Sequence, residues 1–151
     1  HMYLTEWLKT KKDVTVVTNN LLFAIKAVDE DLPSEVILIH GSVNKKTMSV
    51  AGDASIRLLD EFYFDSCFIT VSGVSLTNGC SNRTSPEAQI KRKIISRSKV
   101  KVLMADDSKF DLVFPFSFGH LSDFDYILTN QKPSNDYLDY VETANTKIVW
   151  E

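Results

Sequence analysis

The chain has 151 residues, a mass of 17.1 kDa, a formal net charge of −3 at pH 7 and a pI of about 5.6. This length suits one domain, and its 44% hydrophobic and 25% charged residues are ordinary for a soluble globular protein. The acidic balance excludes an overall basic footprint for DNA or RNA. No apolar run approaches the roughly 20 residues of a membrane helix, and no secretory signal opens the chain.

Patterns typical of strands and of helices alternate along the chain, beginning with the end of a helix at residues 3–8. Apolar and β-branched runs predict the strands, and apolar residues at helical spacing predict the helices. Strands are expected at 14–17, 36–39, 67–71, 100–105, 126–128 and 147–150, and helices at 21–28, 56–62, 85–97 and 137–144.

Capping residues mark two of the helix starts. Thr18 and Asn19 are expected to cap a helix that carries Leu21, Leu22, Ile25 and Val28 on one side. Ser85, Pro86 and Glu87 place a capping serine, a proline and an acid at the start of another helix.

The segments between these elements are expected to be loops. Residues 42–48 are polar, and Asn78-Gly79 is a turn signal that follows a strand ending at Ser72-Gly73. Cys67 is assigned to a strand core and Cys80 to a loop, since their spacing fits neither a metal site nor a redox motif. Phe114, Phe116 and Phe118 recur at period two, as core or subunit-contact residues.

This alternation predicts an α/β domain, Rossmann-like, with a mainly parallel sheet flanked by helices. Right-handed crossovers bring the carboxyl ends of such strands to one edge, where ligands bind. We therefore expect a site where these segments end: Thr18-Asn19, Gly41, Ser72-Gly73, Asp106 and Thr129.

Two clusters carry the chemistry. Glu87 and Lys91 are four residues apart, so they are either an exposed ion pair of about 0.3–0.5 kcal/mol or ligand-binding groups near a helix N-terminus. Asp106 and Lys109 follow a strand, as a plain polar turn or as a hydroxyl-binding acid and a phosphate-binding lysine.

Other motifs carry less information. Single glycines at Gly41 and Gly73 suit either turn geometry or close approach of backbone to a ligand. The sequon Asn82-Arg83-Thr84 is attributed to chance because no secretory route is indicated. A basic run over 91–101 is interpreted as a solvated helix face, since aromatic residues do not interleave it. Phosphate-loop, dinucleotide, nucleophile-elbow and metalloprotease motifs do not occur.

Six segments have a shared order and spacing: VVTNN at 16–20, IHGSVNKKTMSVAG at 39–52, FDSCFITVSGVSLTNG at 64–79, PEAQIKRKII at 86–95, ADDSKF at 105–110 and LSDFDYILTN at 121–130. In these segments the chain resembles, over nearly its whole length, the C-terminal effector-sensing domain of DeoR-type transcriptional regulators. The resemblance implies the isomerase/CoA-transferase-like fold of ribose 5-phosphate isomerase and glucosamine-6-phosphate deaminase. It also implies binding of phosphorylated sugars and an oligomeric repressor. A cytoplasmic location is expected because two unpaired thiols suit a reducing compartment.

The resemblance also implies which residues contact the sugar phosphate. His40-Gly41 stands where the family has a glycine pair, and Asn44 where it often has arginine, so the sugar itself is not specified. The implied ligand-binding residues are Thr18, Asn19, Gly41, Gly73, Glu87, Lys91, Asp106 and Lys109.

We interpret His1-Met2 as a cloning remnant and residues 3–151 as an N-terminally truncated effector-binding domain. The family's winged helix-turn-helix and its first strand, whose Asp-Ser-Gly-Thr-Thr loop helps hold phosphate, do not occur in these residues. DNA is then a partner only through that absent domain, and we expect a homo-oligomer with no membrane partner, no metal and no cofactor.

Three hypotheses follow. The leading one is a sensor that binds a sugar phosphate and is not an enzyme. The second is a sugar-phosphate isomerase or deaminase in which Glu87 and Asp106 act as base and acid. The third is an oligomerisation module with a degenerate pocket.

Overall fold

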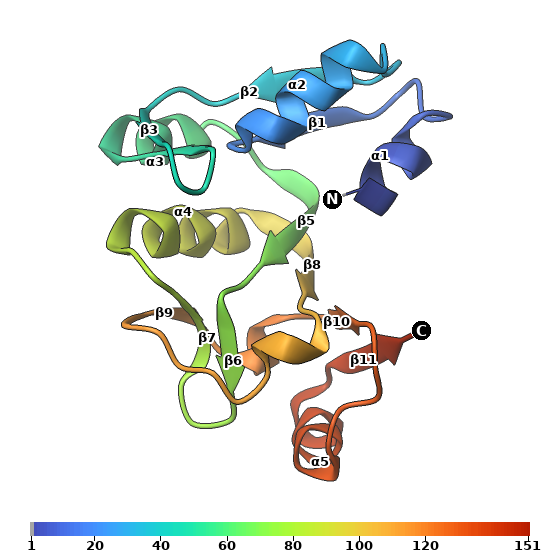
Figure 1. Ribbon diagram of the computed structural model, residues 1–151, viewed down its shortest axis with the longest axis vertical. Coiled ribbons are helices and arrows are strands. Elements are labelled where there is room, and N and C mark those ends of the chain that lie inside the picture. Colours follow the sequence, from blue (N-terminus) through green and yellow to red (C-terminus); the bar gives the residue numbers. More distant parts are fainter. Residues whose placement is uncertain (1) are drawn as a thin grey trace. The chain divides into compact units, whose positions relative to one another are not determined.

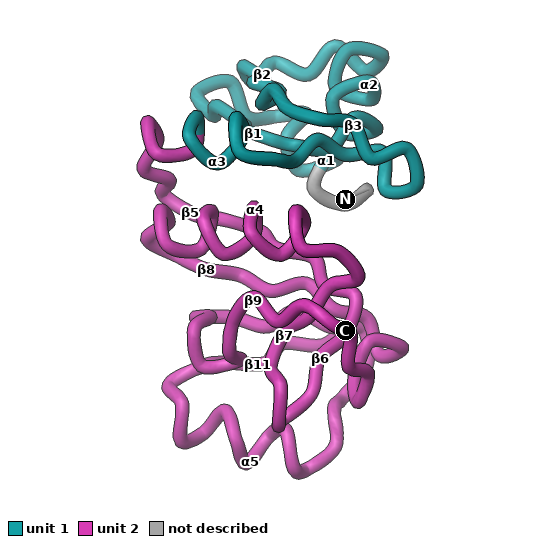
Figure 2. The backbone as a smooth tube through the Cα atoms, turned by 90° about the vertical axis from the view of Figure 1, so that its left-hand side faces the viewer, with its two compact units in different colours: residues 1–58 teal, residues 59–151 magenta. Residues whose placement is uncertain are grey.

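The computed structural model describes the backbone of residues 2–151 and the side chains of residues 5–151, so His1 lies outside the described residues. The chain forms two compact units, residues 1–58 and residues 59–151 (Figure 2). Within the described residues, no helix is long and apolar enough to cross a membrane.

The first unit is built on two parallel strands, β1 and β2, joined through the helix α2 (Figure 1). Its core contains Leu8, Phe23, Ala27 and Leu32. The elements are α1 (Met2–Leu8), β1 (Thr15–Thr18), α2 (Leu21–Asp29), β2 (Glu35–Leu38), β3 (Ser42–Asn44), β4 (Ser49–Ala51) and α3 (Asp53–Leu59).

Helix α2 is capped one residue later than the sequence predicts. The Asn20 side chain, not that of Thr18 or Asn19, accepts a hydrogen bond from the Phe23 amide at 2.8 Å. Phe23 and Ala27, four residues apart, form the buried side of the helix. The apolar residues that the sequence analysis grouped on one side of this helix are not its buried side. Leu22, Ile25 and Val28 are 56%, 54% and 80% exposed.

Residues 42–48 are not simply a loop, and this prediction was wrong. Strands β3 and β4 pair antiparallel, with Ser42 opposite Ala51. Each strand has only three residues, which is too short to show alternation in a mostly polar sequence.

The second unit contains a four-stranded sheet in the order β11-β10-β8-β5, with all pairs parallel. Its described elements are β5 (Phe64–Thr70), β6 (Gly73–Ser75), β7 (Gly79–Asn82), α4 (Ser85–Ser96), β8 (Ser98–Met104), the 3₁₀ turn η1 (Asp107–Lys109), β9 (Phe116–Gly119), the 3₁₀ turn η2 (Leu121–Asp123), β10 (Tyr126–Thr129), α5 (Asn135–Ala144) and β11 (Lys147–Trp150). The α/β class and the mainly parallel sheet flanked by helices are therefore confirmed.

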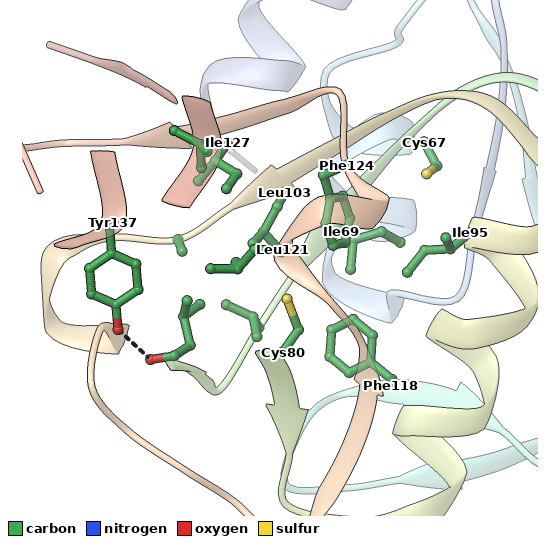
Figure 3. Packing of buried hydrophobic residues seen from close by; sticks show 14 of the residues in the cluster. Cys67, Ile69, Cys80, Ile95, Leu103, Phe118, Leu121, Phe124, Ile127 and Tyr137 are labelled. Atoms are coloured by element: carbon green, nitrogen blue, oxygen red, sulfur yellow. Dashed lines mark hydrogen bonds between the residues drawn. The ribbon is translucent and has the colours of Figure 1, made fainter. Parts of the chain in front are cut away.

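One face of this sheet carries the core of the unit (Figure 3). Ile69, Leu103 and Ile127 are at most 3% exposed and come from three adjacent strands. Side chains of α4 and α5 pack against them, among them Ile95 and Tyr137.

A second, antiparallel sheet of the order β6-β7-β9 was not expected from the sequence. Residues 72–73 are not followed by a loop as predicted, because Gly73 is the first residue of β6. A turn at Asn78-Gly79 connects β6 to its antiparallel partner β7. The predicted turn is confirmed, and Gly79 has a φ of 67°. Cys80 lies on β7 and is fully buried, so its assignment to a loop was wrong.

Candidate functional site

The carboxyl ends of three neighbouring strands lie in register at one edge of the four-stranded sheet. Thr70 of β5 pairs with Met104 of β8, which in turn pairs with Leu128 of β10. The polar residues that follow these strands are therefore brought to one edge, as expected for a ligand site in a parallel sheet.

A buried hydrogen-bond network lies after β5, and its centre is Asn82 on β7. The Asn82 amide nitrogen donates to the Glu87 carboxylate at 2.8 Å and to the Ser72 hydroxyl at 3.3 Å. Its oxygen accepts from the Lys91 ammonium at 3.0 Å. Glu87 also accepts from the Thr84 hydroxyl at 3.1 Å, so both predicted residues of helix α4 are fixed by protein partners.

Lys91 is an anchor between α4 and the end of β5. Its ammonium donates to the Thr70 carbonyl oxygen at 2.7 Å and lies 5.4 Å from the centre of the Phe118 ring. Burial lowers the pKa of Lys91 to about 8, against the opposing effect of the Glu87 carboxylate. Within the described residues Glu87 and Lys91 form no direct ion pair, so Asn82 mediates the pairing that their spacing suggested.

A second polar cluster follows β8. The Asp106 carboxylate caps the turn η1 by accepting hydrogen bonds from the amide and the hydroxyl of Ser108. The hydrogen bond from the Ser108 hydroxyl holds the pKa of Asp106 below its ordinary value, and the bond from the Ser108 amide has a smaller effect in the same direction. Asp107 and Asn130 exchange hydrogen bonds of 2.7 and 2.8 Å, which ties this turn to the end of β10.

Lys109 ends the turn η1 and differs from Lys91 in its partners. Among residues 5–151, whose side chains are described, no group lies within hydrogen-bond or salt-bridge distance of its ammonium. Its backbone amide donates to the Asp106 carbonyl oxygen at 3.1 Å. The Asp106 carboxylate is near enough to interact electrostatically with Lys109. A partly buried cation with no hydrogen-bond partner among the described side chains, beside the carboxyl end of a parallel strand, is suited to bind an anion.

Gly73 is explained by packing within the chain. A Cβ atom there would collide with the Leu112 carbonyl oxygen and come within 2.9 Å of the Phe114 ring. The segment after η1 thus lies directly against the start of β6.

The remaining predicted residues lie together in the first unit, after β1 and β2. The Thr18 hydroxyl accepts from the Asn20 amide at 3.0 Å, and the Asn19 side chain donates to the Val50 carbonyl oxygen at 3.1 Å. Gly41 has a φ of 154°, and a Cβ atom there would come within 2.8 Å of the Ala51 carbonyl oxygen. Each of the three thus has a structural role within its own unit.

A pocket in the second unit lies near the sheet edge but includes none of the predicted ligand-binding residues. It lies between the turn η1 and the loop that leads from β10 into α5. Its lining residues are Asp107, Phe110, Asp111, Gln131, Lys132, Pro133, Ser134 and Tyr137.

Metal-ligating residues do not gather anywhere in the described part of the chain, where no group of three or more His, Cys, Asp or Glu side chains is placed to hold an ion. Both cysteines are free and buried. Burial raises the pKa of the Cys80 thiol to about 12, so this thiol remains protonated and unreactive at neutral pH.

Comparison with protein families gives one match that covers most of the chain. Residues 1–131 match the DeoR C terminal sensor domain. The chain belongs to the DeoR sensor-domain family.

Several bacterial regulators are similar to this sensor domain along most of its length. The HTH-type transcriptional regulator IolR of Bacillus subtilis is 28% identical over 91% of the chain, and the glycerol-3-phosphate regulon repressor of Haemophilus influenzae is 28% identical over 89%. An uncharacterized HTH-type transcriptional regulator of Bacillus subtilis, FruR, is 26% identical over 98%. The chain spans only 54%, 51% and 58% of these three proteins.

Sequence reasoning missed two residues of this site. Asn82 drew attention only as part of a glycosylation sequon, although its side chain organises the network after β5. Asn130 was passed over as the residue after a strand, although it holds the η1 turn. Asn82 and Asn130 share one sequence signal: each is an asparagine at or just after the end of a strand.

Proposed function

We propose that this chain is the effector-sensing domain of a DeoR-type transcriptional regulator and that its effector is a phosphorylated sugar. In this proposal the domain assembles as a homo-oligomer, and effector binding controls operator binding by a DNA-binding domain outside residues 1–151. Membership of the sensor-domain family supports the regulatory role. The relatives, which are named as regulators and repressors, support it as well.

The observation that carries the sugar-phosphate proposal is the contrast between Lys109 and Lys91. The Lys91 ammonium already bonds Thr70 and Asn82, whereas the Lys109 ammonium has no such partner in the described chain. Lys109 is therefore assigned to the phosphate group. Lys91 and Glu87 are assigned to holding the wall of the site beside it.

The sugar itself would be bound by hydroxyl-binding groups near the same edge. Hydrogen bonds from Ser108 hold the pKa of Asp106 below its ordinary value. Its ionised carboxylate can accept hydrogen bonds from sugar hydroxyls. Backbone at Gly73 completes this part of the proposed site. Thr18, Asn19 and Gly41 lie in the first unit and remain predicted ligand-binding residues.

Binding has a regulatory effect only when the ligand distinguishes two states of the regulator. A sugar phosphate present at 100 times its dissociation constant for one state stabilises that state by about 2.7 kcal/mol relative to a state that does not bind it. This is sufficient to shift the populations by about a hundredfold, in the direction of operator release or of operator retention.

The test uses a full-length regulator that carries this domain, bound to its operator DNA. Pentose and hexose phosphates are added one at a time, each beside the same sugar without its phosphate. The proposal predicts that at least one phosphate ester raises the melting temperature and changes operator affinity, while its unphosphorylated sugar does neither. A panel in which no phosphate ester has either effect contradicts it.

The isomerase or deaminase hypothesis requires Glu87 and Asp106 to exchange protons with a substrate. Both carboxylates instead accept hydrogen bonds from neighbouring side chains, Glu87 from Asn82 and Asp106 from Ser108. We therefore propose a sensor and not an enzyme. Turnover assays with ribose 5-phosphate and glucosamine 6-phosphate separate the two functions.

A further inference from the structure

The two faces of the four-stranded sheet differ in what covers them. Odd-numbered positions of β5, β8 and β10, such as Ile69, Leu103 and Ile127, point into the core beneath α4 and α5 (Figure 3). Side chains of successive strand residues point to opposite faces. The even-numbered positions therefore form a second face, away from that core.

This second face is apolar and exposed around its margin, while Val102 at its centre is only 7% exposed. One row across the strands runs from Phe68 through Val102 to Tyr126, and the next runs from Met104 through Leu128 to Val149. Four of these side chains are substantially exposed: Phe68 42%, Tyr126 40%, Leu128 37% and Val149 46%. Parallel sheets occur almost only with both faces covered, so an apolar face of this kind indicates a missing layer.

The size of the face distinguishes between possible occupants. Each aromatic side chain has about 200 Å² of surface, and Leu128 and Val149 have less. With roughly 40% of each exposed, the four side chains contribute at most about 300 Å². A stable interface between folded copies needs about 800 Å² from each partner, so this face alone is too small for one. Strands about 4.8 Å apart and rows about 7 Å apart give an area that one α-helix, about 10 Å wide, covers.

We infer that this face binds an amphipathic α-helix supplied by a part of the full-length polypeptide outside residues 1–151. The three relatives described above have such additional chain, because this chain spans only 51–58% of their length. The helix would present apolar residues at three- and four-residue spacing along one side. Lys147, which continues the first row beyond Tyr126, favours an acidic residue at that corner.

The inference is tested with Leu128→Glu in two proteins, the 151-residue chain and the full-length regulator. In the short chain the new carboxylate enters water, so the melting temperature should remain nearly unchanged. In the full-length protein it must be buried beneath the helix, and the melting temperature should fall by about 5 °C or more. Val28→Glu, at an apolar position that is 80% exposed on α2, is the matched control.

A second variant covers the case in which Leu128→Glu prevents folding of the full-length protein. Leu128→Cys introduces an exposed thiol, whereas the two native cysteines are buried. Its alkylation by iodoacetamide should be at least tenfold slower in the full-length protein than in the short chain, independent of protein concentration. Equal rates in the two proteins overturn the inference. So does slow alkylation in the short chain, or protection that disappears on dilution, which would identify a second copy as the occupant.

Discussion

The side-chain oxygen of Asn82 accepts a hydrogen bond from the Lys91 ammonium at 3.0 Å. Because the nitrogen of the same amide donates to Glu87 at 2.8 Å, Asn82 separates two opposite charges that helical spacing alone would have paired. One buried amide thereby connects β7, α4 and, through Lys91, the end of β5.

Replacing Asn82 should destabilise the fold strongly. Asn82→Ala leaves the Glu87 carboxylate and the Lys91 ammonium without their shared partner, and hydrogen bonds to charged groups contribute about 1.5–3 kcal/mol each. We expect a loss of about 3 kcal/mol in the free energy of unfolding, measured by urea denaturation. The control Asn135→Ala, at an exposed position on α5, should change it by less than about 0.5 kcal/mol. Similar losses in both variants would show that Asn82 has no special role.

Lys91 should give the stability a particular pH dependence. Burial lowers the pKa of Lys91 from 10.5 to about 8, so between these two values the unfolded chain holds a proton that the folded chain has released. Stability rises with pH wherever the unfolded state binds more protons. Wild type should therefore gain stability relative to Lys91→Met between pH 8 and pH 10, as followed by urea denaturation at each pH.

Cys80 interacts with Lys91, but burial raises the pKa of its thiol to about 12, above this range. Groups that titrate in this range and do not interact with Lys91 contribute equally to wild type and to Lys91→Met. Their effect cancels in the difference between the two proteins. A difference that stays constant from pH 8 to pH 10 would mean that Lys91 is solvated as freely in the folded state as in the unfolded one.

Gly73 should not tolerate a methyl group. In Gly73→Ala the new Cβ collides with the Leu112 carbonyl oxygen, and overpacking of this kind costs about 1–3 kcal/mol. At Gly119 the closest atom to a new Cβ is the tip of the Asp123 side chain at 3.2 Å, which can move. Gly119→Ala is therefore expected to be the milder substitution in thermal denaturation, and the reverse order would argue against the packing of the 112–114 segment on β6.

Tyr137 should ionise only at unusually high pH. Burial, followed by its hydrogen bond with Asp111 at 2.8 Å, raises the pKa of Tyr137 to about 12. Its hydroxyl also lies 3.3 Å from the Val74 carbonyl oxygen (Figure 3). Ultraviolet titration of the five tyrosines should show one late step that disappears in Tyr137→Phe, together with about 1 kcal/mol of stability. Retention of the late step in the variant would assign it to another residue.

The sequence predicted those parts of the fold whose signal is local and long enough to repeat. The strand at 147–150 was placed at the residues it occupies, and the α4 helix within one residue of its start and end. Apolar strands that alternate with helices impose this order, and the crossover rule then fixes the edge where Thr70 and Met104 end side by side.

What the sequence did not predict depends on pairing between segments. Strands β3 and β6 have three residues each, containing Ser42, Asn44 and Gly73, and only their antiparallel partners identify them as strands. The buried side of α2 depends on Phe23 and Ala27 meeting the core of the first unit. Asn82 gains its role from contact with a helix that begins three residues later, which no spacing rule reveals.

The most direct test of the sensor proposal is calorimetric titration of a sugar phosphate into the full-length regulator and its Lys109→Ala variant. Lys99→Ala, an exposed lysine on β8, is the matched control. We predict at least a tenfold loss of affinity on Lys109→Ala, equivalent to about 1.4 kcal/mol, and no change on Lys99→Ala. Equal affinity in the two variants would contradict the assignment of Lys109 to the phosphate group.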